Sequence, residues 1–298
     1  MENSISRHKN ILADLGLFYA VAIWGSTFFI VKSALDGIDP VILVAYRFLI
    51  AGVVLVIFLK FSGRPILENW KQALVPGFLL WMLYIPQTIG LQYTTASNSG
   101  FITGLFVAFV PVFLRIIFKR KPTTMEVIAS AISLIGLWIL TGGMSDINIG
   151  DVMTLITAVT YALHLLYCDK YMKQKIDPYL FSCHQFLLVG LLSIITALLF
   201  SLPFEIRSSD AFWMMLFLAL FPTLSAFVIQ MAAQKIRSPL RVSLIFALEP
   251  VFAALFAWTL GGETIIKHRA LGGLLIFLAL VISGLPSPKK KSLIGKSK

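Results

Sequence analysis

The sequence predicts an all-α integral membrane protein, with ten transmembrane helices arranged as two inverted-topology five-helix repeats around a central cavity. Three observations lead to this prediction: apolar runs along the whole chain, an alternating distribution of basic residues, and an internal repeat. Of the 298 residues, 58% are hydrophobic and only 13% are charged. Because soluble domains carry roughly a quarter charged residues, the lipid bilayer is the solvent that suits this chain.

Apolar runs of the length of a transmembrane helix follow one another along the sequence. Such a helix needs about 20 mostly apolar residues, and the gaps between the runs leave no room for a further domain. The first run follows Arg7 and Lys9 and is too long for the apolar part of a signal peptide, so we expect it to be retained. The predicted helices span 11–34, 39–60, 72–92, 97–118, 124–142, 150–170, 178–201, 211–231, 239–260 and 269–286.

The basic residues are concentrated in alternate connections between these helices. Twenty of the 25 Lys and Arg residues fall on the side of the N-terminus, and four fall on the other side. Because basic connections stay in the cytoplasm, we expect cytoplasmic N- and C-termini and a basic cytoplasmic tail over 287–298. The net charge of +11 is thus a topology signal, and we do not expect nucleic-acid binding.

Short segments recur at a nearly constant spacing. Ile38-Asp39-Pro40 recurs as Ile176-Asp177-Pro178, and Pro111-Val112-Phe113 recurs as Pro250-Val251-Phe252. Residues 1–145 and 146–286 are therefore predicted to be two five-helix repeats, and an odd number of helices inverts the second repeat. Inverted repeats are typical of secondary transporters, in which a cavity between the halves opens to alternate sides. The alternative is an old duplication in a membrane protein that does not transport.

With this topology, the sequence resembles the drug/metabolite transporter superfamily, specifically its EamA-type members. The stretch 243–255 (SLIFALEPVFAAL) is similar to the family's helix-9 pattern, and Gly262-Glu263 is similar to the Gly-Glu that follows it. Trp24-Gly25-Ser26, Arg47-Phe48 and 94–98 (TTASN) resemble earlier motifs. The resemblance implies ten helices around a central cavity, and export of amino acids, related metabolites or toxic organic compounds across a bacterial inner membrane. The sixth helix departs from the pattern, since Tyr161 stands where Trp is common.

Few ionisable side chains fall at bilayer depth, where they are costly and usually functional or paired. Glu249 directly precedes Pro250, which lacks an N–H and loosens a helix. This acid could bind a substrate ammonium, carry a coupling proton, pair with Arg47, or be a structural acid. Arg47 is predicted to be structural, bonding backbone carbonyls or an acidic partner from a peripheral helix. His164 lies on a polar helix face and is either a substrate or proton site or a packing histidine.

Aromatic side chains on the expected cavity helices complete the predicted site, because aromatic faces bind organic cations. Any one of them could instead pack or face lipid, and Asn98 could equally cap a helix. The predicted substrate-binding residues are Trp24, Trp81, Tyr84, Gln87, Asn98, Tyr161, His164 and Glu249, and those with structural or coupling roles are Arg47, Pro111 and Pro250.

The function predicted from the sequence is secondary transport. The chain has no Walker A, HExxH or GxSxG motif and no cluster with metal-ligand spacing, so we expect neither an enzyme nor a cofactor or metal. We expect export of amino acids or related compounds across the inner membrane by alternating access. The alternatives are an organic-cation or multidrug exporter, a non-transporting membrane protein, and an intramembrane enzyme. The expected partners are a small-molecule substrate, the lipid bilayer and a proton as candidate coupling ion, for a monomer or homodimer.

Overall fold

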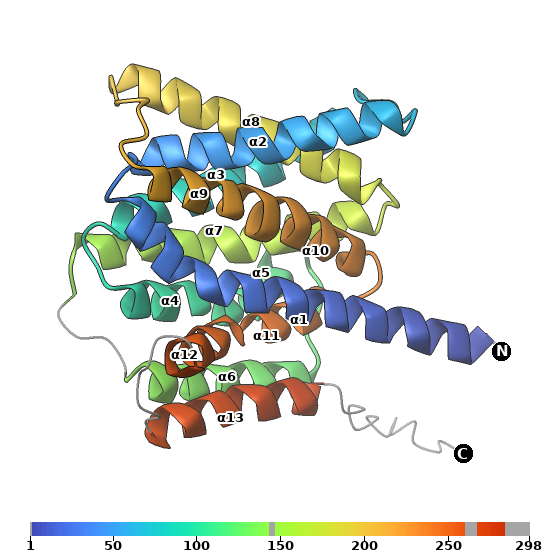
Figure 1. Ribbon diagram of the computed structural model, residues 1–298. Helices are drawn as coiled ribbons and strands as arrows, with labels where there is room; N and C mark the ends of the chain where they lie inside the picture. Colours follow the sequence, from blue (N-terminus) through green and yellow to red (C-terminus); the bar gives the residue numbers. More distant parts are fainter. Residues whose placement is uncertain (1, 143–146, 260–266, 284–298) are drawn as a thin grey trace, which may run out of the picture.

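The computed structural model describes residues 2–142, 147–259 and 267–283, within which all regular structure is helical. Figure 1 shows the helices in one bundle. Gly262-Glu263 and the predicted tail lie outside the described residues. The helices are α1 (Glu2–Ala34), α2 (Pro40–Phe61), the 3₁₀ turn η1 (Trp70–Ala73), α3 (Leu74–Gly90), α4 (Ala96–Gly104), α5 (Phe106–Ile116), α6 (Thr124–Thr141), α7 (Ile149–Met172), α8 (Pro178–Leu199), α9 (Ser209–Leu218), the π-helical η2 (Ala219–Ser225), α10 (Ala226–Gln234), α11 (Pro239–Phe246), α12 (Glu249–Thr259) and α13 (Lys267–Ser283).

Most of the predicted transmembrane runs are found as long apolar helices. Within the described residues, nine helical stretches are long and apolar enough to cross a membrane. They correspond in order to the first nine predicted runs. The tenth predicted run contains the apolar stretch Ala270–Ser283 of α13, which is shorter than the 18 residues of a full span. The described residues thus give nine full-length spans and one shorter apolar helix.

The two Ile-Asp-Pro segments start α2 and α8 in the same way. The Asp39 side chain accepts hydrogen bonds from the backbone N–H groups of Val41 and Ile42, and Asp177 accepts one from Tyr179. In both helices the proline that follows the aspartate occupies the first turn, where its missing N–H is not needed. The recurrence in the sequence is therefore a helix-start signal that is used in both halves.

Helices α2 and α8 lie side by side at the upper edge of the bundle in Figure 1. A Cβ atom added at Gly52 would meet Leu187 Cδ2 at 2.8 Å, and one added at Gly190 would meet Leu49 Cδ2 at 2.5 Å. Gly190 and Leu187 are the repeat counterparts of Gly52 and Leu49. The contact is reciprocal, as expected where two equivalent segments pack about a local two-fold axis.

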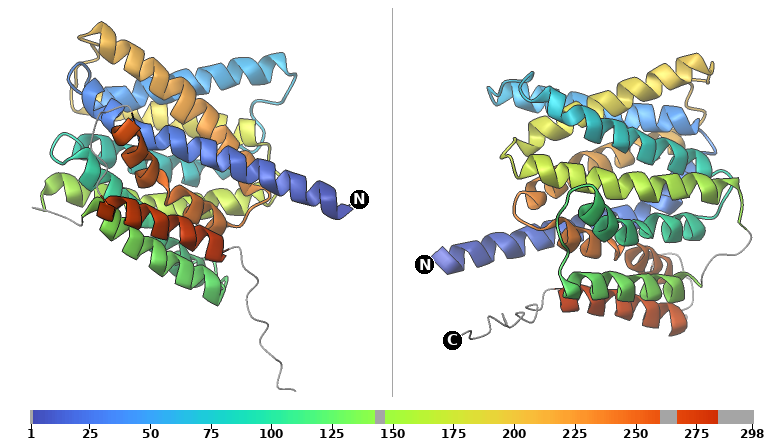
Figure 2. Two further views of the ribbon diagram at one scale, coloured as in Figure 1. Left: turned by 60° about the horizontal axis from the view of Figure 1, so that its bottom comes forward. Right: turned by 180° about the vertical axis from the view of Figure 1, so that it is seen from behind.

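The opposite edge of the bundle is formed by α6 and α13 (Figure 2). A Cβ atom added at Gly272 would lie 2.3 Å from the backbone nitrogen of Leu140 and 2.6 Å from the carbonyl oxygen of Gly136. The two backbones touch because glycine removes the side chains between them, which is how helices approach closely in membranes. This contact fixes α13 on the bundle although its apolar stretch is short.

One helical stretch in each half is broken at a comparable place. The first break is at Leu105, between α4 and α5, and the second separates α11 from α12. At the second break Pro250 has no N–H to bond the carbonyl of Phe246, one turn earlier, and α11 ends at that residue. Pro111 lies within α5, six residues after the first break, and the helix continues through it. Irregular backbone at bilayer depth is tolerated where it lines a cavity or is buried in protein.

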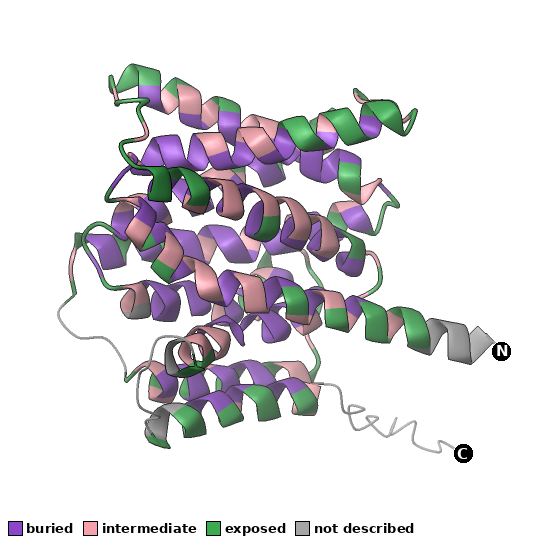
Figure 3. Ribbon diagram, viewed as in Figure 1, coloured by how far each residue is buried: buried purple, intermediate pink, exposed green. Residues whose placement is uncertain are grey.

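The outer faces of the bundle are apolar, and its ends differ in charge. Large hydrophobic side chains are exposed on α8 and α13, among them Leu191, Leu198 and Phe277, and Figure 3 shows buried residues in the interior. Such faces suit lipid. We call the end at which α1 begins and α13 ends the basic end; it includes Lys60, Arg64, Lys71, Lys173 and Arg237.

Candidate functional site

A pocket lies inside the bundle and draws residues from both halves of the chain. It comprises about 520 Å³ of space between atoms, open solvent included. Val31 and Leu91 line it and lie nearer the ends of α1 and α3 than Trp24 and Tyr84 do, so the pocket extends away from the basic end. The lining residues are Trp24, Thr27, Phe28, Val31, Arg47, Leu83, Tyr84, Gln87, Thr88, Leu91, Thr103, Tyr161, Phe227 and Glu249.

Glu249 brings a carboxylate into this pocket from the first residue of α12. The residue is only 8% exposed. Among the described residues, its side chain has no hydrogen bond and no ion pair within 4.0 Å, so a pairing with Arg47, one of the alternatives left open by the sequence, is not made. Buried charged groups are normally paired, so a carboxylate that lines a pocket without a partner is suited to receive one from a ligand.

Arg47 also lines the pocket, although α2 lies at an edge of the bundle. Its guanidinium donates to the hydroxyl groups of Thr223 and Tyr84, the latter at 3.3 Å, and its Cζ atom is 4.7 Å from the centre of the Tyr84 ring. The sequence-based expectation of backbone carbonyls or an acidic partner was wrong, because hydroxyl groups on α3 and η2 reach the guanidinium instead. Arg47 is thereby oriented and stays beside the pocket.

The π-helical segment η2 explains why Thr223 faces Arg47. Pro222 has no N–H to bond the carbonyl of Leu218, and the hydroxyl group of Thr223 donates to that carbonyl at 2.7 Å. The Pro222 carbonyl in turn accepts a hydrogen bond of 2.8 Å from Trp24 Nε1. Single π-helical turns are common at functional sites, and here one joins Arg47 and Trp24 to the same short segment.

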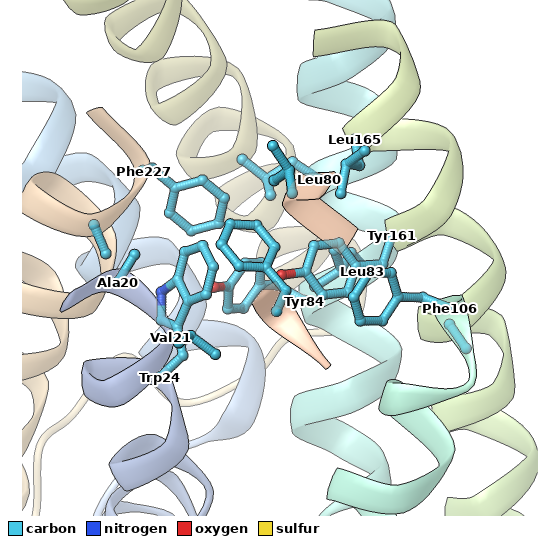
Figure 4. Close-up of a cluster of buried hydrophobic side chains, with 14 of the residues drawn as sticks. Ala20, Val21, Trp24, Leu80, Leu83, Tyr84, Phe106, Tyr161, Leu165 and Phe227 are labelled. Carbon is cyan, nitrogen blue, oxygen red and sulfur yellow. The ribbon is translucent and has the colours of Figure 1, made fainter. Parts of the chain in front are cut away.

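Aromatic rings form the wall of the pocket and the layer behind it (Figure 4). Trp24 lies 4.9 Å from the ring of Phe246 and 5.1 Å from that of Phe227, measured between centroids. Tyr161 stacks on Phe106 at 4.4 Å. The side of the pocket that faces the basic end is therefore closed by packed rings.

Some of the predicted site residues line the pocket, and others do not. Trp81, Asn98 and His164 lie outside its lining. Trp81 is one turn from Tyr84 and packs on Phe78 at 5.8 Å. The residues that line the pocket are Trp24, Arg47, Tyr84, Gln87, Tyr161 and Glu249.

Asn98 lies in a second hollow at the end opposite the basic end, beside Lys32 and Asn148. It is not the N-cap of α4, because its backbone N–H donates to the side chain of Thr95, which caps the helix. Lys32 is held there by a 2.7 Å hydrogen bond to the Thr94 carbonyl. The hollow lies just beyond Val31 and Leu91 of the central pocket.

His164 is fully buried between helices rather than in the pocket. Its Nε2 atom is 2.8 Å from Gln185 Oε1 and 3.3 Å from the Cys168 sulfur. Cys168 and Cys183 are free, buried thiols. The polar face of the sixth predicted helix thus points to a buried polar cluster.

Several residues that line the pocket or lie behind it were not predicted from the sequence. Thr27 and Thr88 follow Trp24 and Tyr84 by three and four residues, so helical spacing could have added them. Phe227 carried no signal, because it lies in a continuous apolar run. Thr223 could have been found from its place after Pro222, where a hydroxyl group often replaces the missing backbone donor.

Ion pairs hold the basic end together. Asp14 of α1 pairs with Arg237 and, at 3.3 Å, with Arg241, and Arg241 also donates to the Leu280 carbonyl of α13 at 2.8 Å. Further pairs are Arg120–Asp169 at 2.8 Å and Arg64–Asp177 at 2.6 Å. These contacts join helices of both halves at the basic end, and the pocket extends in the opposite direction.

The chain is similar over nearly its whole length to known transporters. The sequence model of the EamA-like transporter family matches residues 11–142 and again 148–285. An uncharacterized transporter of Archaeoglobus fulgidus is 32% identical over 279 residues, which is 93% of this chain and 87% of the relative. The uncharacterized inner membrane transporter YedA of Escherichia coli is 26% identical and covers 93% and 92%.

Two further matches are a transporter with a named substrate and a solved structure. A protein of Chlamydia muridarum described as an S-adenosylmethionine/S-adenosylhomocysteine transporter is 26% identical, over 83% of this chain and 84% of its own length. One crystal structure has the same fold, with a TM-score of 0.78 at 18% identity over 91% of this chain and 96% of that chain. With two matches to one family model and multi-pass helices, the chain belongs to the EamA-like transporter family.

Proposed function

We propose that this protein is a secondary transporter that exports amino acids or related compounds across the inner membrane of a bacterium by alternating access. The observation that carries the proposal is Glu249, a buried carboxylate that has no hydrogen-bond or ion-pair partner among the described residues and lies in a pocket with aromatic walls. It would take the ammonium group of the substrate, whose charge also favours the faces of Trp24 and Tyr161. Arg47 at the same pocket would take a carboxylate.

The membrane topology in this proposal has ten helices in two inverted halves. The reciprocal contact between α2 and α8 and the two matches to one family model support a duplicated chain. The short helix α13 would be the tenth span. The basic end, with the N- and C-termini, would face the cytoplasm because basic connections remain there. The pocket would then extend toward the outside.

The relative from Chlamydia muridarum favours an amino-acid group in the substrate. S-adenosylmethionine carries an α-amino-acid end, whose ammonium and carboxylate groups match the charges of Glu249 and Arg47 in the pocket lining. An organic-cation exporter is the second candidate, favoured by the same carboxylate and the rings of Trp24, Tyr84 and Tyr161. The two candidates differ in whether the substrate needs a carboxylate, and therefore in whether it needs Arg47.

The test begins with a thermal-shift screen of purified protein against amino acids and cationic drugs. Compounds that stabilise the protein are then followed in proteoliposomes, with and without a pH gradient. Glu249→Gln keeps the shape but removes the charge, so we expect transport to fall by about tenfold or more, the size of a charge-assisted hydrogen bond of ~1.5–3 kcal/mol. Glu68→Gln, at an exposed glutamate, is the control.

The outcomes test the role of Glu249, the coupling and the choice between the two candidates. Transport by Glu249→Gln at the rate of the unchanged protein would remove Glu249 from the proposal. Stimulation of transport by a pH gradient would support proton coupling, and its absence would favour a uniporter. Transport of amino acids but not of their amides would identify the carboxylate as necessary, whereas transport of lipophilic cations would favour the second candidate.

A further inference from the structure

A row of uncharged polar side chains lies buried in the half of the bundle between the pocket and the basic end. His164 of α7, Gln185 of α8, and Gln230 and Gln234 of α10 are each at most 2% exposed. We call these four residues the inner polar row. None of them lines the central pocket, and none has a role in the proposed binding of substrate. Such a row is unusual at bilayer depth, where polar side chains are costly.

The hydrogen bonds within the row are incomplete. Gln185 Oε1 is 2.8 Å from His164 Nε2, and Gln230 Nε2 donates to Gln234 Oε1 at 3.2 Å. Gln234 Nε2 donates to the Leu165 carbonyl at 2.9 Å. Among the described residues, His164 Nδ1 and Gln230 Oε1 have no partner, although both atoms are buried. The packed row therefore leaves one ring nitrogen on α7 and one amide oxygen, an acceptor, on α10 without a hydrogen bond among the described residues.

The energetic cost of this arrangement argues against a purely structural role. An unpaired buried polar atom costs about 1–3 kcal/mol, and apolar side chains of the same shape would avoid that cost. Water would satisfy both atoms if the helices separated, because a polar site of sufficient size binds water readily. The row is consequently better suited to a hydrated state than to the packed state of this structure.

The row has the pocket at one end and the basic end of the bundle at the other. The ring of Phe227 lines the pocket and lies edge-on to the His164 ring, with 6.1 Å between their centroids. At the other end, the Lys173 ammonium donates to the backbone carbonyl of Gln234 at 2.9 Å and to the backbone carbonyl of Arg237 at 3.0 Å. Phe227 thus lies between the row and the pocket, and Lys173 and a cluster of buried apolar side chains, among them Met172 and Phe181, lie at the end of the row toward the basic end.

We propose that the inner polar row lines the passage through which the substrate reaches the pocket from the cytoplasm. This inference rests on the proposed function and adds a second set of substrate contacts to it. Imidazole and amide groups offer both donors and acceptors, so they would replace water around the ammonium and carboxylate of an amino acid. Because the row carries no formal charge when His164 is neutral, it would not hold the zwitterion as tightly as Glu249 and Arg47, and passage requires weak binding.

The chain contains its own probes for this passage. Its two cysteines are equally buried, but they lie in different surroundings. Cys168 is 3.3 Å from His164 in the row, whereas the Cys183 sulfur is 3.7 Å from the Gly52 carbonyl at the interface of α2 and α8. Thiols react as thiolates, so a buried thiol reacts with a charged reagent only when water reaches it.

The experiment compares two variants with a single cysteine each: Cys183→Ala, which keeps Cys168, and Cys168→Ala, which keeps Cys183. Inside-out membrane vesicles are treated with a membrane-impermeant, cationic methanethiosulfonate, and the remaining thiols are counted after denaturation. We expect Cys168 to be modified at least about tenfold faster than Cys183. We also expect little modification of Cys168 in right-side-out vesicles.

Equal rates for the two cysteines, or modification of Cys168 only from the outside, would overturn the inference. Uptake of the amino acid identified in the screen is measured in parallel in the vesicles. Transport without modification of Cys168 would reject the passage and leave the proposed function standing. Modification without transport of any amino acid would reject the proposed substrate and keep a hydrated passage at the row.

A paired substitution separates passage from packing. Gln230→Met combined with Gln234→Met removes both amides together, and removal of both partners is nearly neutral or stabilising for a fold. We expect an unchanged or higher melting temperature, together with slower modification of Cys168 and slower transport. A lower melting temperature with unchanged modification would show that the two glutamines serve packing alone, and would overturn the inference.

Discussion

At the scale of single residues, Thr223 performs two tasks with one hydroxyl group. It donates to the Leu218 carbonyl, which Pro222 cannot bond, and it accepts from Arg47. The orientation of a buried guanidinium at the pocket therefore depends on a backbone irregularity in another helix. Positioning of this kind is what a binding site requires from its supporting side chains.

Thr223→Val tests this dependence because valine has nearly the same shape without the hydroxyl. The substitution leaves Arg47 Nε without this partner, and we expect a loss of about 1–3 kcal/mol for the group left unpaired. A thermal denaturation curve in detergent measures the loss. Thr196→Val is the control, since Thr196 donates only to the Leu192 carbonyl of its own helix. Equal melting temperatures for the two variants would contradict the role assigned to Thr223.

At the scale of elements, glycines decide how closely helix pairs approach. Gly272 and Gly273 are neighbours in α13 but face different surroundings. A Cβ atom on Gly272 would lie 2.3 Å from the backbone of Leu140, whereas one on Gly273 would have its nearest neighbour, Val251 Cγ1, at 3.3 Å. Backbone atoms cannot move aside as a flexible side chain can, so only the first position is closed to a side chain.

Gly272→Ala should therefore separate α13 from α6, while Gly273→Ala should be tolerated. We expect the first variant to lose about 1–3 kcal/mol, the usual cost of overpacking, and the second to be near neutral because alanine favours helix formation. Both are compared by their melting temperatures and by protease sensitivity of the connection before α13. Similar stability of the two variants would mean that α13 is loosely attached to α6.

At the scale of the whole molecule, the ion pairs at the basic end join the two halves. Asp14 lies at the centre of this group, with a side chain that is 16% exposed and two arginine partners. By contrast, Glu205 and Arg207 form a pair within one connection, with side chains more than 60% exposed. Exposed pairs contribute little to stability, so the two sites offer a matched comparison.

Asp14→Asn should loosen the basic end, and Glu205→Gln should have no effect. We expect Asp14→Asn to increase the rate of Cys168 modification from the cytoplasmic face by about tenfold, which corresponds to about 1.4 kcal/mol. The measurement uses the Cys183→Ala background in inside-out vesicles. A lower melting temperature without faster modification would assign the Asp14 ion pairs to stability alone.

The fold was largely predictable from the sequence because each spanning helix is encoded locally, by its own apolar run and its flanking basic residues. The break before Glu249 was predictable from Pro250, but the break at Leu105 carries no local signal. Candidate pocket residues could be chosen from helices expected to line a cavity. The rotation of each helix about its axis was not predictable, since it depends on packing between distant segments. For this reason the bonding partners of Arg47 were wrongly predicted and Phe227 was not found.

The two opposite charges at the pocket, on Glu249 and Arg47, have an electrical consequence. If the carboxylate is ionised, its charge and that of the guanidinium sum to zero, and a zwitterionic amino acid adds no net charge. The membrane potential would then act equally on the empty and the loaded transporter, whereas a bound organic cation would add one charge. Moving one charge through the full membrane potential changes the free energy by about 2.3 kcal/mol per 100 mV, so only the export of a cation would be driven or opposed by the voltage.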